Sequence, residues 1–272
     1  MKAAKSVILY ALAILWLVIA GYPYAYMFAT SLKDQSGFFR DPTGLIGKYT
    51  LDSYKLVFEL GLFRYFANSV IISVICVGLV IILACMVSYC LARMRFFLNR
   101  PLYFIFIAGM MIPVHTTLIP VYILTREMGL YDQLWALVGP YIAFSLPVSV
   151  IILTQFAREI PGELEEAAIM DGAGRTRTFV SVILPLLAPA TATVGIYNFI
   201  HIWNEFVFAL ILISTKARMT LPLGLREFYA EFSVNVPGIM AALTLGSLPL
   251  LIAYFISQEK VVSGISAGAV KG

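Results

Sequence analysis

Residues Ala157 to Pro185 read AREIPGELEEAAIMDGAGRTRTFVSVILP, the longest charged insert between two strongly apolar segments of the chain. The inner part of this stretch predicts a short helix. Pro161 suits a first helical position, because the N–H that proline lacks would have no partner there. Acidic side chains crowd the next turns, where they interact favourably with the helix dipole. Gly172 can adopt a positive φ and end the helix. We therefore expect a helix over residues 163–171.

One face of the expected helix is apolar and small, because Leu164, Ala167 and Ala168 fall at positions i, i+3 and i+4. The helix is too short to span a bilayer, and it lacks the bulky and basic residues of a helix that lies on a membrane surface. The pattern favours docking into a groove of another protein. A plain connecting loop is the alternative; it explains the charge but not the helix signals at both ends.

The spacing of Glu166-Ala167-Ala168, Gly172, Val182 and Leu184-Pro185 resembles the EAA motif of permease subunits of bacterial ATP-binding-cassette importers. The motif has Ile where this chain has Val182. Two further stretches, Trp203-Asn204-Glu205-Phe206 and the terminal Gly268-Ala269-Val270-Lys271-Gly272, resemble the sugar-importer branch, the maltose-permease-like inner-membrane subunits. Each short motif is weak by itself, but three matches in the right order are specific together.

The resemblance implies a complex around this chain. Its partners would be a second permease subunit, two ATPase subunits that hold ATP and Mg, an external solute-binding protein and the membrane lipid. The substrate would be a sugar or oligosaccharide moved by alternating access, with glycerol phosphate or another small solute as the alternative. The residues implied to couple this chain to an ATPase subunit are Leu164, Glu166, Ala167, Ala168, Asp171 and Gly172.

The composition predicts an all-α integral membrane protein. Of 272 residues, 61% are hydrophobic and 12% are charged, whereas a soluble domain carries about a quarter charged residues. We expect one membrane domain over residues 1–272, with a core transport module at about 66–258 and a cytoplasmic tail at 259–272. A net charge of +4 without a long basic run argues against nucleic-acid binding. The three cysteines, Cys76, Cys85 and Cys90, share one apolar segment and are expected to be buried thiols.

Six apolar segments predict six transmembrane helices, since a span needs about 20 residues. The first segment follows two lysines and is longer than the roughly 7 to 15 residues of a signal-peptide core, so we expect an uncleaved span. The polar segment 30–64 is expected to have little structure of its own, and 214–237 is expected to be a second external loop. The expected spans are residues 7–28, 66–91, 102–124, 135–156, 186–213 and 238–256.

Orientation rests on the density of basic residues. Lysines and arginines divide almost evenly between the two sides, but Arg93, Arg95 and Arg100 sit in a short turn beside membrane ends, where the positive-inside rule has force. This favours cytoplasmic N- and C-termini, in a multi-pass protein of the bacterial cytoplasmic membrane.

The fifth expected span carries unusual polar residues. Asn198, His201 and Glu205 share a helix face, with Asn204 on its flank. An ionisable group at membrane depth is costly unless it faces a cavity or a partner. These four residues are therefore candidates for the translocation path or for the interface with the partner permease. Two alternatives stay open: a polar stripe that holds this helix to a neighbouring helix, and a Glu205 at the outer interface.

The sequence contains no phosphate-binding loop, no H-E-x-x-H pair and no G-x-S-x-G turn. We therefore expect a non-catalytic subunit, with no cofactor and no metal on this chain, whose energy comes from ATP hydrolysed elsewhere. A secondary transporter or channel would also cross the membrane six times, but it would not need the EAA spacing. A membrane enzyme would show clustered His, Asp or Glu at one membrane surface.

Overall fold

The computed structural model describes residues 2–45, 47–231 and 235–269, and side chains within 5–45, 47–230 and 235–256. The described chain is nearly all helical, which confirms the predicted class. Four helices in it are long and apolar enough to cross a membrane: Lys5–Ser31, Leu62–Arg93, Leu134–Glu159 and Val236–Ile256. Two bent pairs would each supply one more span, namely Asn99–Met110 with Val114–Glu127, and Arg175–Leu186 with Ala188–Trp203.

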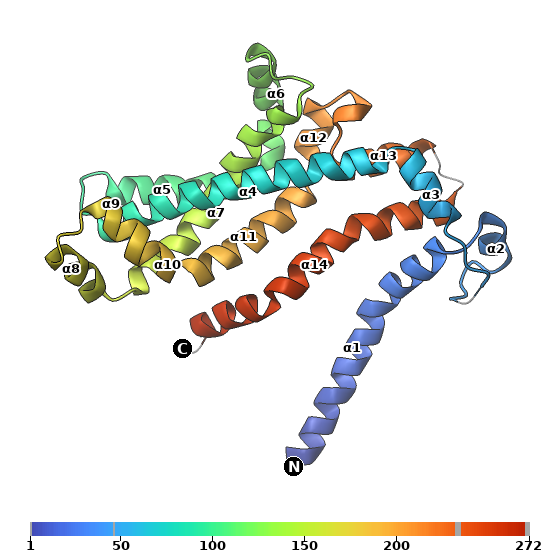
Figure 1. Ribbon diagram of the computed structural model, residues 1–272, viewed down its shortest axis with the longest axis horizontal. Coiled ribbons are helices and arrows are strands. Elements are labelled where there is room, and N and C mark those ends of the chain that lie inside the picture. The colour runs from blue at the N-terminus through green and yellow to red at the C-terminus, as the bar shows by residue number, and fades with distance from the viewer. Residues whose placement is uncertain (1, 46, 232–234, 270–272) are drawn as a thin grey trace. The chain divides into compact units, whose positions relative to one another are not determined.

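Figure 1 follows the helices in chain order. The α-helices are α1 (Lys2–Ser31), α2 (Gln35–Arg40), α3 (Asp52–Glu59), α4 (Leu62–Arg93), α5 (Asn99–Met110), α6 (Leu118–Glu127), α7 (Val138–Glu159), α8 (Gly162–Met170), α9 (Arg175–Thr178), α10 (Leu184–Leu186), α11 (Ala188–Trp203), α12 (Val207–Leu212), α13 (Leu221–Glu231) and α14 (Val236–Ala269). Short 3₁₀ turns lie at Val114–Thr117, Leu134–Leu137 and Lys216–Arg218, and a π-helical turn lies at Phe179–Ile183.

The chain divides into two compact units, residues 1–66 with 223–249 and residues 67–222 with 250–272. In the first unit, the segment after α1 is organised by a buried lysine. Lys33 is only 2% exposed, and its ammonium donates hydrogen bonds to the carbonyls of Asp41 (2.9 Å) and Gly44 (2.5 Å). The backbone N–H of Thr50 donates to the carbonyl of Leu32 at 2.6 Å and closes the loop.

Two expectations about the polar segments are therefore wrong. Residues 30–64 are not structureless, because the buried Lys33 ammonium needs fixed carbonyl acceptors and the segment also folds into α2 and α3. The stretch 214–237 is not a plain loop either, since α13 occupies Leu221–Glu231. Hydropathy reports how polar a segment is, not whether its backbone is hydrogen-bonded.

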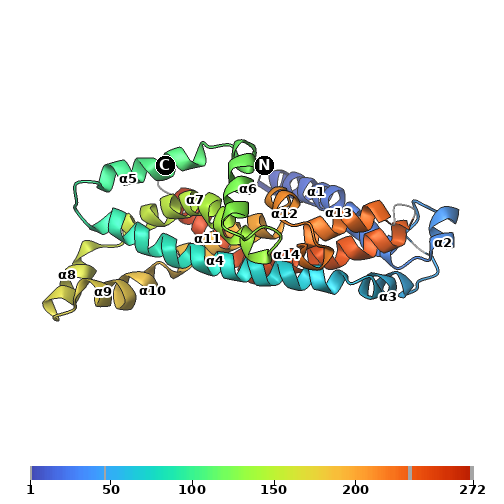
Figure 2. The ribbon, with the colours of Figure 1, turned by 90° about the horizontal axis from the view of Figure 1, so that it is seen from above.

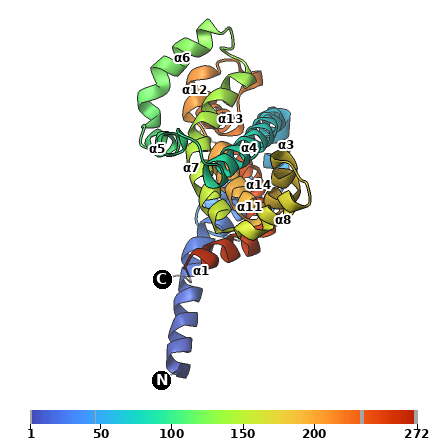
Figure 3. The ribbon, with the colours of Figure 1, turned by 90° about the vertical axis from the view of Figure 1, so that its left-hand side faces the viewer.

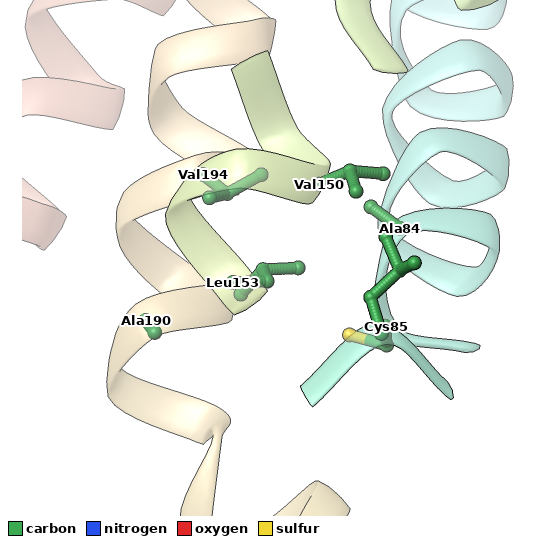
Figure 4. Packing of buried hydrophobic residues seen from close by; sticks show 7 residues of the cluster. Ala84, Cys85, Val150, Leu153, Ala190 and Val194 are labelled. Atoms are coloured by element: carbon green, nitrogen blue, oxygen red, sulfur yellow. The ribbon is translucent and has the colours of Figure 1, made fainter. Parts of the chain in front are cut away.

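The core of the second unit lies between α4, α7 and α11 (Figure 4). Small and branched side chains let these helices approach closely. The buried residues of this cluster are Ala84, Cys85, Leu91, Val150, Leu153, Ala190 and Val194. Cys76 and Cys85 are buried free thiols as predicted, while Cys90 is half-buried.

Two of the expected spans are broken. The third turns by 96° between α5 and the segment from Val114, at Pro113, which lacks an N–H and disfavours a helical residue before it. The fifth was expected over 186–213, and the structure shows that it is not one continuous helix. It bends by 72° at Leu187, just before Pro189, and it stops again between α11 and α12 at residues 204–206.

Asp132 joins the loop after α6 to the loop after α12, two helices that lie side by side in Figure 3 and contact each other. Its φ of +57° is a left-handed conformation that Asp tolerates better than most residues. The carboxylate accepts hydrogen bonds from the N–H of Ser214 (2.9 Å) and Thr215 (2.8 Å) and pairs with Arg218 at 3.2 Å. Burial would raise the pKa of Asp132, but hydrogen bonds from Thr215 and Ser214 hold it at about 2.

Replacing Asp132 with Asn should loosen residues 213–218, because Asn tolerates the same φ but loses the charge and one acceptor oxygen. We expect amide hydrogen exchange at Ser214 and Thr215 to become about tenfold faster, with exposed Glu127→Gln as the charge-matched control. The folded pKa lies below the ordinary value of 3.8, so the carboxylate should stabilise the loop fully above about pH 4 and lose this effect toward pH 2. Equal exchange rates in the two variants would contradict this role.

Candidate functional site

The polar stretch forms the expected helix, α8 (Gly162–Met170), shifted by about one residue from the expected 163–171. Pro161 does not take the first helical position. Its ψ of 135° is extended, so it flanks the helix. Glu163 and Glu165 lie in the first turn, at the positive end of the helix dipole.

Gly172 ends α8 with a left-handed turn, as its position in the sequence predicted, with φ +79°. The N–H of Gly172 donates to the carbonyl of Ile169, and the N–H of Ala173 donates to that of Ala168, both at 2.9 Å. This pair of bonds is the Schellman arrangement, which satisfies carbonyls that a helix end leaves free. The turn sends the chain from α8 into α9 (Arg175–Thr178).

The outer face of α8 is open in this chain. Glu166 and Ala167 are exposed, Leu164 is 43% exposed and Ala168 is half-buried. The apolar surface extends further than the sequence analysis predicted, because Ile169 and Met170 are 55% and 86% exposed. A small helix rarely leaves this many apolar side chains in water unless another protein covers them.

The inner face of α8 is held by Glu165, which the sequence analysis did not single out. Its carboxylate accepts a hydrogen bond from the Tyr89 hydroxyl at 2.8 Å and lies 3.9 Å from the Arg93 guanidinium. Arg93 also donates to the carbonyl of Ile160, just before α8. Tyr89 and Arg93 are one turn apart at the end of α4, and Figure 2 shows α8 beside that end. We call Tyr89, Arg93 and Glu165 the α8 anchor.

An apolar cluster packs around Tyr89 of the α8 anchor. The Tyr89 ring lies 5.0 Å from the ring of Phe179, measured between centroids. Tyr89 is buried together with Ala157, Ile183 and Leu187, which come from the end of α7 and from the segment after α9. Tyr89, the α4 residue that donates to Glu165, is therefore packed against two further parts of the chain.

Asn198, the first of the predicted path residues, is fully buried between α11 and α7. Its amide donates hydrogen bonds to the Ser149 hydroxyl and to the carbonyl of Val194, each at 2.8 Å. Within this chain, Asn198 therefore joins two helices, which is the alternative that the sequence left open.

Glu205 lies at the gap between α11 and α12. Its carboxylate accepts hydrogen bonds from the Tyr141 hydroxyl (2.7 Å) and from the N–H of Phe208 (2.8 Å) and Ala209 (3.3 Å). The two N–H groups belong to the first turn of α12, so Glu205 caps that helix. The sequence signal for this role is an acid just before a short apolar helix.

A cavity of about 250 Å³ opens beside these residues. His201 is exposed and its ring lies 4.3 Å from that of Tyr197, while Asn204 is exposed and donates to the carbonyl of Ile200. Three of the four predicted path residues line the cavity, and Asn204 does not. The lining residues are Val114, Pro140, Tyr141, Phe144, Ser145, Tyr197, Asn198, His201, Ile202, Glu205 and Phe208.

The family profile of the binding-protein-dependent transport system inner membrane component matches residues 80–267. The chain belongs to this family. The resemblance to importer permeases is thereby confirmed. The chain is the inner membrane component of a binding-protein-dependent transport system, and its homologues are non-catalytic permease subunits.

Individual relatives cover nearly the whole chain. An ABC transporter permease protein, ORF2, of Caldicellulosiruptor sp. (strain Rt8B.4) is 50% identical over 258 residues, 94% of each protein. The trehalose transport system permease protein SugB of Mycobacterium tuberculosis (strain CDC 1551 / Oshkosh) is 35% identical, over 96% of this chain and 97% of SugB. The fold is similar to that in a crystal structure of a bacterial ABC transporter involved in alginate import, with a TM-score of 0.82, 22% identity and coverage of 95% and 96%.

Replacing Gly172 with Ala should destabilise the end of α8 by about 1 kcal/mol or more, because a β-carbon is unfavourable at a positive φ. Gly174→Ala is the matched control. Gly174 has a φ of −70°, and a β-carbon at either glycine would meet no atom within 4 Å. Hydrogen exchange of the α8 amides should therefore speed up in Gly172→Ala and stay unchanged in Gly174→Ala. Identical exchange in both variants would show that the turn does not depend on glycine.

Proposed function

We propose that the chain is the permease subunit of an ATP-driven importer that carries a sugar or oligosaccharide across the bacterial cytoplasmic membrane by alternating access. The observation that carries the proposal is the exposed face of α8 on a fixed base, in a chain of this family. Relatives named as trehalose and diacetylchitobiose permeases support a carbohydrate substrate.

The proposed membrane topology has six spans, in which each bent pair crosses the bilayer once. Both termini and α8 would lie in the cytoplasm, as the arginines after α4 favour. We propose that residues 1–272 form one membrane domain, with a transport module at about 66–258 and a cytoplasmic tail at 259–272. The backbone of this tail is helical to Ala269, and residues 270–272 lie outside the described part of the chain.

The proposed complex contains a second permease subunit, two ATPase subunits that bind ATP and Mg, and an external solute-binding protein. A crystal structure of similar fold, of a bacterial alginate ABC transporter in complex with a periplasmic protein holding an alginate pentasaccharide, is consistent with this composition (TM-score 0.66). In the complex, α8 would dock into a groove on one ATPase subunit and carry its motion into the permease.

Each coupling residue has a proposed role. Leu164, Ala167 and Ala168 would form the docked surface, and small side chains there would allow close approach. Glu166 is exposed and free to meet a basic group of the ATPase subunit. Asp171 and Gly172 would end the helix and set its direction. Ile169 and Met170, both exposed, join the docked surface.

The cavity beside α11 is the proposed part of the translocation path within this chain. His201 and the Tyr197 ring would face a passing solute, since an aromatic ring beside hydrogen-bonding groups suits a sugar face. Asn204 would lie at the interface with the partner permease or at the opening of the translocation path. Asn198 and Glu205 would support the path without contacting the solute. Asn198 would fix α11 against α7, and Glu205 would cap α12.

Replacing Ala167 with Trp should abolish uptake, because the indole would block docking of α8 without disturbing a membrane span. In reconstituted vesicles, we expect uptake to be lost in one of two ways: the ATPase subunits are missing on gels, or hydrolysis stimulated by the binding protein continues without uptake. Ala167→Ser is the control, since it keeps the small volume and should transport normally. Normal uptake by Ala167→Trp would show that α8 only connects its neighbouring helices and does not dock through this face.

The α8 anchor should determine how well hydrolysis is linked to uptake. Glu165→Ala removes both contacts to α4, whereas Glu165→Gln keeps an acceptor for Tyr89 and loses only the charge beside Arg93. We expect the ratio of solute imported to ATP hydrolysed to fall at least threefold in Glu165→Ala and less in Glu165→Gln, because α8 would slide instead of pulling α4.

Glu163→Gln is the matched control for these variants, because Glu163 lies on the same helix but is exposed. Its transport ratio should equal that of the wild type. Subunit content on gels separates the two causes of failure. A complex that has lost its ATPase subunits shows that docking failed. An intact complex with a low ratio of solute imported to ATP hydrolysed shows that the α8 anchor failed. A wild-type ratio in assembled Glu165→Ala would exclude the anchor from coupling.

A further inference from the structure

A second cavity, of about 510 Å³, opens where α4 ends, α5 begins and α7 ends. It lies at the same end of α4 as the α8 anchor, because Leu91, Ala92 and Met94 contribute to its wall. Neither the proposed path nor the docked surface of α8 uses it. Its other lining residues are Arg95, Phe96, Phe97, Asn99, Arg100, Pro101 and Arg158.

Three arginines from three parts of the chain converge on this cavity. Arg95, Arg100 and Arg158 are all exposed. Arg158 lies over the ring of Tyr103, 5.1 Å from its centroid. Across the side chains that the structure describes, no carboxylate lies within ion-pair distance of any of the three. The cavity therefore carries positive charge that no described carboxylate pairs with.

The start of α5 adds to the same field. This helix of 12 residues has no acidic residue in its first turn and no side-chain cap. The aligned peptide dipoles of α5 place partial positive charge at its start, which favours anions, although the N–H of Asn99 donates to the carbonyl of Phe96 and Pro101 has no N–H. Asn99 does not neutralise it, because its amide donates to the carbonyls of Leu91 and Met94 and so closes the end of α4 instead.

The surroundings of the cavity are apolar and exposed. Phe97 is 96% exposed at its rim, and Phe104 and Ile105 on α5 are 64% and 63% exposed. In the proposed topology, α5 is the first half of a bent span, and these side chains would lie where it enters the hydrocarbon region. Guanidinium groups beside aromatic rings at that level are typical of residues that reach the lipid headgroups.

We propose that this cavity binds the phosphate headgroup of an anionic phospholipid, with Arg95 and Arg100 as the principal contacts and Arg158 as the third. A guanidinium can donate two parallel hydrogen bonds to a phosphate. The acyl chains would lie along Phe104 and Ile105. A bound lipid would fill the junction of α4, α5 and α7 beside the α8 anchor and so stiffen the base on which α8 stands.

The test uses the complete transporter, purified in detergent and titrated with phosphatidylglycerol or phosphatidylcholine, with bound lipid counted by native mass spectrometry. We expect several-fold tighter retention of phosphatidylglycerol in the wild type, and at least threefold weaker retention in Arg95→Gln and in Arg100→Gln. Arg177→Gln is the control, since Arg177 is an exposed arginine outside the cavity with the same charge change.

Thermal unfolding and subunit content of each variant show whether it is folded and assembled, and the two arginine variants test the site independently. Equal retention of both lipids, or unchanged retention in both variants, would overturn the proposal. A parallel titration with inorganic phosphate separates the sources: displacement of phosphatidylglycerol at millimolar phosphate would assign the cavity to a soluble anion.

Discussion

The contact of Glu165 with Tyr89 and Arg93 is the interaction on which the functional end of the second unit depends. Without it, no side-chain hydrogen bond or ion pair among the described residues would join α8 itself to α4. Two side chains one turn apart on α4 bind a single carboxylate: Tyr89 donates a hydrogen bond to it and Arg93 forms an ion pair with it. Arg93 also donates to the carbonyl of Ile160. A short polar helix thereby acquires a fixed position against a helix of 32 residues.

This arrangement separates the two faces of α8 by role. The inner face is bound within the chain, while the outer face presents Leu164, Ala167 and Met170 to whatever docks there. In the proposed complex a rigid base would matter, because a push on a loosely attached helix would be absorbed by local motion. Proteins pass displacements through packed elements that have few alternative arrangements.

The sequence predicted those features that depend on local chemistry. The helix at α8, the left-handed Gly172 and the apolar spans all follow from residue type and spacing. It did not predict which of two adjacent acids, Glu165 or Glu166, points inward, because that depends on how α8 is rotated against α4. A preference within one helix carries no information about its rotation relative to another.

The same limit explains the path residues. The sequence pattern places Asn198 and Glu205 on one helix face. Because α11 ends at Trp203, however, the two residues have different surroundings. Their partners, Ser149 and Tyr141, come from a helix about 50 to 60 residues away in the chain. Polar spacing predicted that these side chains share a region, whereas the identity of each partner required the packing of α7 against α11.

The burial of the native thiols has a practical consequence for chemical labelling. Cys76 and Cys85 are closed off in the helix core, and Cys90 is only partly open. Water-soluble maleimides should therefore give a low background on the folded chain. Cysteines introduced one at a time at Lys48 or Arg177 would then report which side of the membrane each position faces, without first removing thiols on which the core packing relies.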